Sequence, residues 1–154
     1  MDFDNFRKEL NCKIYPYNTL GNYKFTVICS NYNDKWIFSK HKQRDTWETQ
    51  GGHIEPKETP LENAKRELFE KSGITDANLY PVCDYDGYTS EGSSNGIVYL
   101  AVVNKLGQLP ESEMERIELF DEIPENFTYP NVTPKLIKEA KILLKKLNTI
   151  NDNK

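Results

Sequence analysis

The sequence predicts an α/β fold in which helices pack against a β-sheet. Its 154 residues suit one domain with a buried core and are too few for two domains of ordinary size. Runs rich in β-branched and aromatic residues lie on both sides of a segment with helical periodicity, and a second helical segment follows them. No internal repeat interrupts this order. We therefore expect residues 1–154 to form a single α/β sandwich.

The first strand-like runs indicate a hairpin. Residues 23–30 (YKFTVICS) and 35–39 (KWIFS) are rich in strand-forming residues, and Asn33 and Asp34 between them favour a tight turn. A short extended piece at 47–49 then leads into a pair of glycines. The first twenty residues carry no pattern that assigns them to a helix or a strand.

The segment that follows the glycine pair has the signals of a helix at both ends. Thr59 and Glu62 form a capping box, in which each side chain can bond to the other residue's backbone N–H. Pro60 suits the first helical position because its missing N–H would be unpaired there in any case. Gly73 lies where a left-handed residue ends a helix. These signals predict a helix over residues 60–72.

The sequence of the second half of the chain predicts three strands followed by a C-terminal helix. The strands are expected at 78–85, 96–103 and 116–120, and a glycine- and serine-rich loop (GYTSEGSSNG) that we expect to be mobile separates the first two. The helix begins at Thr133. Its apolar stripe, which we interpret as core packing, consists of Leu136, Ala140, Leu143 and Leu147.

Composition excludes several classes of protein. The net charge of −4 and the pI near 5.3 give no general attraction for nucleic acid or for anionic membranes. No apolar run reaches the ~20 residues of a membrane span, and the acidic start (MDFDNFRKEL) is unlike a secretory signal, so we expect a cytoplasmic protein. Cys12, Cys29 and Cys83 have no CxxC spacing, which favours reduced, buried thiols.

One face of the predicted helix at 60–72 holds charged side chains that could bind a ligand. Glu67, Glu70 and Lys71 are three and four positions apart, so their side chains leave the helix on the same side. Two carboxylates in this arrangement can bind one hard divalent cation such as Mg²⁺. Glu58 and Arg66 can form an ion pair that braces the preceding loop against the helix. Taken singly, each of these charged residues would be interpreted as solvated helix surface.

The spacing of these residues resembles a known signature. Written G-x5-E-x7-R-E-U-x-E-E-x-G-U, where U is a bulky aliphatic residue, the pattern matches the chain at eight of nine positions: Gly52, Glu58, Arg66, Glu67, Leu68, Glu70, Gly73 and Ile74. This resembles the Nudix box, the signature of the Nudix hydrolase family. The resemblance covers about residues 20–147. It implies an α/β/α sandwich around a mixed β-sheet and the hydrolysis of a nucleoside diphosphate linked to another group, with Mg²⁺ or Mn²⁺ as cofactor.

The resemblance also implies roles for individual residues. Glu67 and Glu70 would be metal ligands in the catalytic centre, and Gly52 would offer its carbonyl to the metal. Arg66 and Glu58 would hold the shape of the loop and helix.

Family members often supply a further glutamate before a late strand. Here PESEMERIELF offers Glu111, Glu113 and Glu115, and the sequence does not say which of them faces inward. We predict Glu111 and Glu115 as ligands.

Lys71 departs from the pattern, since it stands where the family has its last glutamate. The exchange removes a metal ligand and adds a repelling charge. Three interpretations compete. Lys71 pairs with Glu67 and weakens the metal site, or it contacts a substrate phosphate in place of one cation, or catalysis is lost and a nucleotide-binding module remains. Gln50 is a second departure, because proline often precedes the glycine pair, and we expect it to loosen the turn.

Clues to the substrate are fewer. Asn131 stands close to the position at which hydrolases of oxidised guanine nucleotides in this family read their base, although a Tyr-Pro-Asn turn explains it equally well. Arg44, in the basic segment KHKQR, could guide phosphates into the site or simply end a strand in solvent.

The leading hypothesis is a metal-dependent hydrolase that cleaves a phosphoanhydride bond in a nucleoside triphosphate or related compound, with oxidised purine nucleotides such as 8-oxo-dGTP as the favoured class. The alternative is a nucleotide sensor with little or no turnover. Both imply a small nucleotide as ligand, and the resemblance adds a homodimer.

Overall fold

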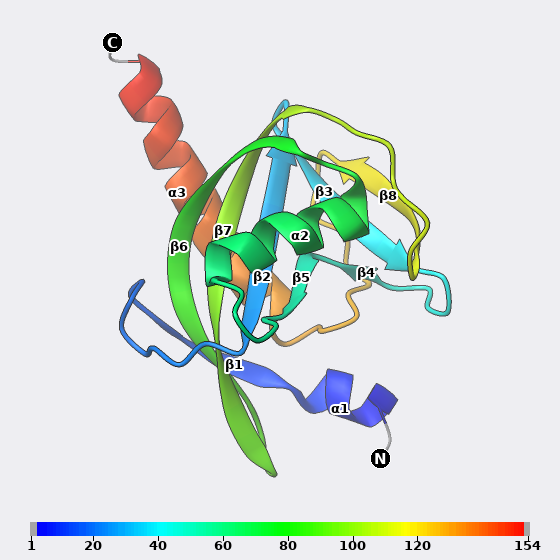
Figure 1. The fold of residues 1–154 in the computed structure, drawn as a ribbon, viewed down its shortest axis with the longest axis vertical. Helices are drawn as coiled ribbons and strands as arrows, with labels where there is room; N and C mark the ends of the chain where they lie inside the picture. The colour runs from blue at the N-terminus through cyan, green and yellow to red at the C-terminus, as the bar shows by residue number, and fades with distance from the viewer. Residues whose placement is uncertain (1–2, 153–154) are drawn as a thin grey trace.

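In the computed structural model, which describes residues 3–152, a mixed β-sheet lies between two helices (Figure 1). The strands are β1 (Asn11–Tyr15), β2 (Phe25–Tyr32), β3 (Lys35–His41), β4 (Trp47–Glu48), β5 (Gln50–His53), β6 (Asp76–Thr89), β7 (Gly92–Lys105) and β8 (Met114–Phe120), and the helices are α1 (Phe3–Glu9), α2 (Pro60–Ser72) and α3 (Thr133–Asp152). The ends of the predicted domain, residues 1–2 and 153–154, lie outside the described residues. No helix within residues 3–152 is long and apolar enough to cross a bilayer.

The sheet is mixed because one of its pairings is parallel. Its strand order is β1-β6-β7-β2-β3-β4, with β5 paired to β2 and β8 paired to β3. Strands β2 and β7 run parallel, whereas the other pairings are antiparallel. The predicted hairpin is confirmed as β2 and β3, and Asn33 and Asp34 between them have φ angles of 49° and 64°. Positive φ at both central residues is the requirement of the tight turns that join twisted strands.

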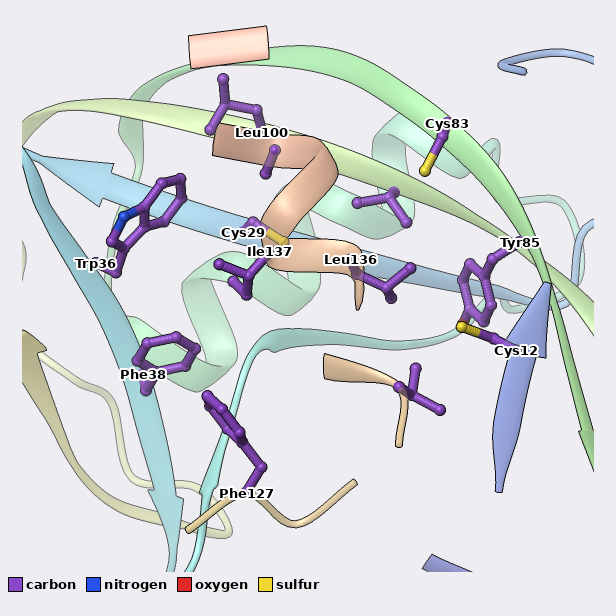
Figure 2. Close-up of a cluster of buried hydrophobic side chains, with 13 residues drawn as sticks. Cys12, Cys29, Trp36, Phe38, Cys83, Tyr85, Leu100, Phe127, Leu136 and Ile137 are labelled. Atoms are coloured by element: carbon purple, nitrogen blue, oxygen red, sulfur yellow. The ribbon is translucent and has the colours of Figure 1, made fainter. Parts of the chain in front are cut away.

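Each face of the sheet is covered by one helix, so the predicted α/β/α sandwich is confirmed. Helix α2 places Ala64 and Leu68 against Ile28 and Ile37 of the sheet. Helix α3 covers the opposite face, where Figure 2 shows its Leu136 and Ile137 among the side chains of a second core. That second core also holds Trp36, Phe38 and Phe127. Cys12, Cys29 and Cys83 are buried there as free thiols, as the sequence indicated.

Helix α2 begins and ends where its capping signals predicted. The Thr59 hydroxyl accepts from the Glu62 N–H at 3.1 Å, and the Glu62 carboxylate accepts from the Thr59 N–H at 3.0 Å. Gly73 adopts a left-handed conformation with φ 80°, and its N–H donates to the Phe69 carbonyl. The helix is therefore fixed at both ends by local interactions, which holds its charged face in one orientation.

The glycine- and serine-rich segment differs from the predicted loop. Residues 87–96 belong to a long hairpin, in which β6 and β7 pair as far as Thr89 and Gly92 (Figure 1). Strand β1 extends the sheet by pairing Asn11 with Tyr88 and Cys12 with Gly87. The unassigned first residues include α1 and β1, and β1 pairs with strand β6 of this hairpin.

Replacing Gly73 with alanine should destabilise the protein by about 1–3 kcal/mol, because a side chain is strained at positive φ. A Cβ built on Gly73 would also lie 2.3 Å from the Gln108 carbonyl oxygen. The matched control is Gly87→Ala, where the nearest atom would lie at 3.5 Å, an ordinary contact. Urea denaturation should show a loss for the first variant and none for the second. Equal losses would mean that the conformation at Gly73 is not what ends α2.

Candidate active site on helix α2

The guanidinium of Arg66 joins the loop before α2 to the helix itself. Its Nε and Nη2 donate to the two oxygens of Glu58 at 2.7 and 3.1 Å, which places the predicted ion pair across the loop. Its Nη1 donates to Glu70 at 3.2 Å and contacts Glu67 at 3.3 Å, and Nη2 donates to the His53 carbonyl at 3.4 Å. A planar, five-donor group can serve several acceptors at once in this way. One cation therefore positions all three glutamates.

Asn63 is a buried polar residue that the sequence analysis missed. It lies on the apolar face of α2, fully buried, and its amide donates to the His53 carbonyl at 2.7 Å and to Glu58 at 2.9 Å. Its carbonyl accepts from the Thr26 hydroxyl of β2. A polar residue within an apolar helix stripe was the signal that could have revealed it. Asn63 thus fixes the same loop from the core side.

Glu67 is the buried carboxylate of the site. Only 10% of its side chain is exposed, and its Oε1 would lie 2.6 Å from a Cβ built on Gly52. Glycine at position 52 is therefore what allows β5 to approach the carboxylate. Burial raises the pKa of Glu67, and the nearby charges of Lys71 and Arg66 oppose this effect. Glu70, one turn further along, is 47% exposed and faces outward from the same cluster.

Lys71 reaches into the site. Its ammonium donates to the Gly51 carbonyl at 2.6 Å and lies 3.7 Å from Glu67 Oε2 and 3.6 Å from Glu113 Oε1. Only 16% of the side chain is exposed. The carbonyl that accepts from Lys71 is that of Gly51, and the predicted role of the Gly52 carbonyl stays a prediction. Lys71 holds this position through contacts with three separate segments of the chain.

The three acids around the start of β8 pair with three different lysines. Glu113 reaches Lys71, whereas Glu111 pairs with Lys42 at 2.5 Å and Glu115 pairs with Lys40 at 2.9 Å. The pairing of β8 with β3 shifts register between Lys40 and His41, which separates the directions of these side chains. The structure therefore brings Glu113 to the carboxylate cluster and does not bring Glu111 or Glu115, the two predicted ligands.

A pocket of about 620 Å³ opens beside this cluster. Gly51, Gly52 and Lys71 are among its lining residues, together with residues of β2, of the β6–β7 hairpin and of the first turn of α3. Its aromatic walls are Phe25, Tyr85 and Tyr129. A concave site with apolar walls and a few polar groups at one end suits a ligand with a flat ring and an anionic tail.

Two predicted substrate-binding residues lie elsewhere. The Asn131 amide donates to the Lys8 carbonyl at 2.7 Å, which ties α1 to the turn before α3, and the residue does not line the pocket. Arg44 lies 3.7 Å from Glu48 and is likewise outside the pocket lining. Of the predicted substrate-binding set, the structure places only Lys71 at the pocket.

Gln50, which we expected to loosen the turn, is held by buried hydrogen bonds. Its buried amide accepts from the Ser30 hydroxyl at 2.7 Å and donates to the Ser39 hydroxyl at 2.9 Å. Ser39 in turn donates to the Lys71 backbone carbonyl at 2.7 Å. This chain of buried hydrogen bonds connects β2, β3 and β5 to the end of α2. It holds in place the strand that contains the glycine pair.

Comparison with known proteins places the chain in a family. Residues 23–140, which make up most of the chain, match the model of the NUDIX domain family. A curated relative is "Putative 8-oxo-dGTP diphosphatase YtkD" from Bacillus subtilis (strain 168), which is 32% identical over 124 residues, or 79% of this chain and 77% of the relative. The chain therefore belongs to the Nudix domain family, and it is a Nudix hydrolase.

Solved structures share the fold. The chain is similar to a crystal structure of a mutant of the Bacillus subtilis pyrophosphohydrolase BsRppH, with a TM-score of 0.72, 24% identity, and coverage of 86% of this chain and 89% of that one. It is also similar to the NUDIX domain of Shewanella oneidensis NrtR, crystallised with ADP ribose, with a TM-score of 0.63, 16% identity, and coverage of 84% and 92%. At these identities the likeness concerns the fold alone.

The Glu58 ion pair should contribute stability that depends on pH. Hydrogen bonds from Arg66 lower the pKa of Glu58 from its ordinary value of 4.5 to about 2, with a smaller effect from the Glu55 backbone. The contribution is therefore complete above about 4.5 and disappears as the pH falls through about 2. Urea midpoints of the protein and of Glu58→Gln should differ at pH 7 and converge as the pH falls.

Glu122→Gln provides the control, since Glu122 is exposed and far from the loop in sequence. Its midpoint should follow that of the unmodified protein at every pH. A gap for Glu58→Gln that stays constant from pH 7 down to pH 3 would contradict the charge-dependent role of the pair.

Proposed function

We propose that the protein hydrolyses a phosphoanhydride bond in a nucleoside triphosphate or a related nucleoside diphosphate compound, with Mg²⁺ or Mn²⁺ as cofactor. Oxidised purine nucleotides are the first substrates to test, because the 32% identical relative carries the name of an 8-oxo-dGTP diphosphatase. The single observation that carries the proposal is that the Glu67 carboxylate lies directly beside Gly52 and Lys71, which both line a pocket with aromatic walls, while Arg66 holds Glu70 to the same cluster.

The donor set suits a hard divalent ion. Within residues 3–152 no group of three or more His, Cys, Asp or Glu side chains is arranged to hold a metal by itself. Glu67 and Glu70 nevertheless offer carboxylate oxygens beside an open pocket, and Mg²⁺ commonly takes one or two carboxylates and completes its shell with water and substrate phosphates. These two residues would hold the ion. When bound, it would neutralise phosphate charge and lower the pKa of a water molecule.

The residues of the chain would perform the remaining steps. Lys71 places a positive charge at the end of the pocket where phosphates would lie. Glu67, whose pKa is raised by burial, would orient the attacking water beside the ion that it helps to hold. Arg66, held by Glu58, keeps both glutamates in place. Phe25, Tyr85 and Tyr129 offer surfaces on which a base could stack.

A nucleotide sensor with little turnover is the second candidate. The observation that favours it is the ammonium of Lys71 inside the carboxylate cluster, where it lowers the need for a metal ion. The two candidates share the pocket and differ in turnover.

A panel of nucleoside triphosphates, 8-oxo-dGTP, nucleotide sugars and dinucleoside polyphosphates separates them. We expect Mg²⁺-dependent release of a nucleoside monophosphate from at least one compound, measured by chromatography of the products. Saturable binding without turnover on the whole panel would favour the sensor. A protein that neither binds nor hydrolyses any compound on the panel would refute both candidates.

Glu67→Gln and Glu70→Gln should each lower kcat/KM by roughly 10²-fold or more, since the loss of a ligand removes several kcal/mol of charge stabilisation in the transition state. Glu122→Gln should keep the full rate, because Glu122 is an exposed residue outside the pocket. Steady-state kinetics on the best substrate measures all three. Full activity in Glu67→Gln and Glu70→Gln would contradict their role.

A further inference from the structure

Lys71 lies among oxygens from three separate parts of the chain. The Gly51 carbonyl comes from β5, Glu67 from α2 and Glu113 from the segment before β8. Such a convergence of one carbonyl and two carboxylates is typical of a site for a hard divalent cation. In this protein the ammonium of Lys71 already occupies it.

We infer that Lys71 is a built-in cation that takes the place of one divalent ion, so that the active site binds one metal ion fewer than its oxygen ligands would otherwise hold. The inference rests on the proposed function, and it concerns the metal requirement of the same site. The ammonium neutralises part of the charge of Glu67 and Glu113 permanently. Because Lys71 also lines the pocket, the same charge is available to a phosphate group of the ligand.

A simple salt bridge along the helix does not account for the geometry. An exposed i, i+4 pair gains little and leaves both side chains in solvent. Here the shortest contact of the ammonium is 2.6 Å to a carbonyl on another element, and only 16% of the side chain is exposed. The helix contact, to Glu67, is the longest of the three at 3.7 Å. The side chain is therefore directed into the cluster and away from the helix surface.

Formal charges show why the position matters. Two carboxylates and one ammonium give the group a net charge of −1, which Lys71→Glu would change to −3. Three carboxylates and a carbonyl within a few ångströms repel one another unless a cation joins them. A variant of this kind should therefore recruit a divalent ion to the position that the ammonium now fills.

The test counts Mn²⁺ ions. Electron paramagnetic resonance of free Mn²⁺ during titration should give one more bound ion per chain for Lys71→Glu than for the unmodified protein. Lys71→Met, which removes the charge and adds no ligand, should gain the same site with weaker affinity. Lys71→Met provides the test if Lys71→Glu does not fold. Equal numbers of bound Mn²⁺ in the unmodified protein and in whichever variants fold would overturn the inference.

A second substitution in the Lys71→Glu background locates the new ion. Adding Glu113→Gln should weaken the gained Mn²⁺ site at least about tenfold, which is the lower bound seen for residues that only support a ligand. Adding Glu111→Gln is the matched control and should leave that affinity unchanged, because Glu111 pairs with Lys42. Equal weakening by the two substitutions would place the ion elsewhere and overturn the inference.

These outcomes are separate from those of the proposed function. A protein that turns over no nucleotide, yet gains a Mn²⁺ site in Lys71→Glu, would retain the built-in cation and lose the proposed hydrolysis. A protein that hydrolyses nucleotides, yet binds the same number of Mn²⁺ ions in every variant, would show the reverse.

Discussion

The ion pair between Arg66 and Glu58 is the interaction on which the rest of the site depends. Arg66 bridges a loop and a helix, and the same guanidinium holds Glu67 and Glu70. Asn63 anchors the loop from the core side, and the chain of hydrogen bonds through Gln50 supports the glycine pair from behind. Because these contacts cross between elements, the carboxylates are positioned before any ligand arrives, which is the condition for electrostatic catalysis.

The sequence predicted those parts of the protein that depend on local interactions. The capping box at Thr59 and the glycine at 73 fixed both ends of α2 to the residue, because caps act within one turn of the helix. The spacing of Glu58 and Arg66 predicted their pairing. The hairpin of β2 and β3 followed from the strand propensities around Asn33 and Asp34.

Features that depend on distant contacts could not be predicted in the same way. The segment 87–96 has the composition of a loop, and it forms strand because its β6 half pairs with its β7 half, while β1 pairs with Gly87 and Tyr88. Glu113 contacts Lys71 next to the point where the register of β8 against β3 shifts, and that shift leaves no trace in the local sequence. Asn131 contacts α1, a helix whose position depends on the long hairpin. Each of these outcomes is decided by tertiary structure.

The position of Lys71 gives the site its particular character. An ammonium tethered among a carbonyl and two carboxylates supplies positive charge there, and in our proposal Glu67 and Glu70 would still hold one divalent ion. The most direct measurement is a crystal structure with Mn²⁺ and a non-hydrolysable nucleotide analogue, recorded with anomalous scattering. We predict a Mn²⁺ peak shared by the carboxylates of Glu67 and Glu70 and the phosphates of the analogue. Phosphates bound in the pocket with no Mn²⁺ at these carboxylates would contradict it.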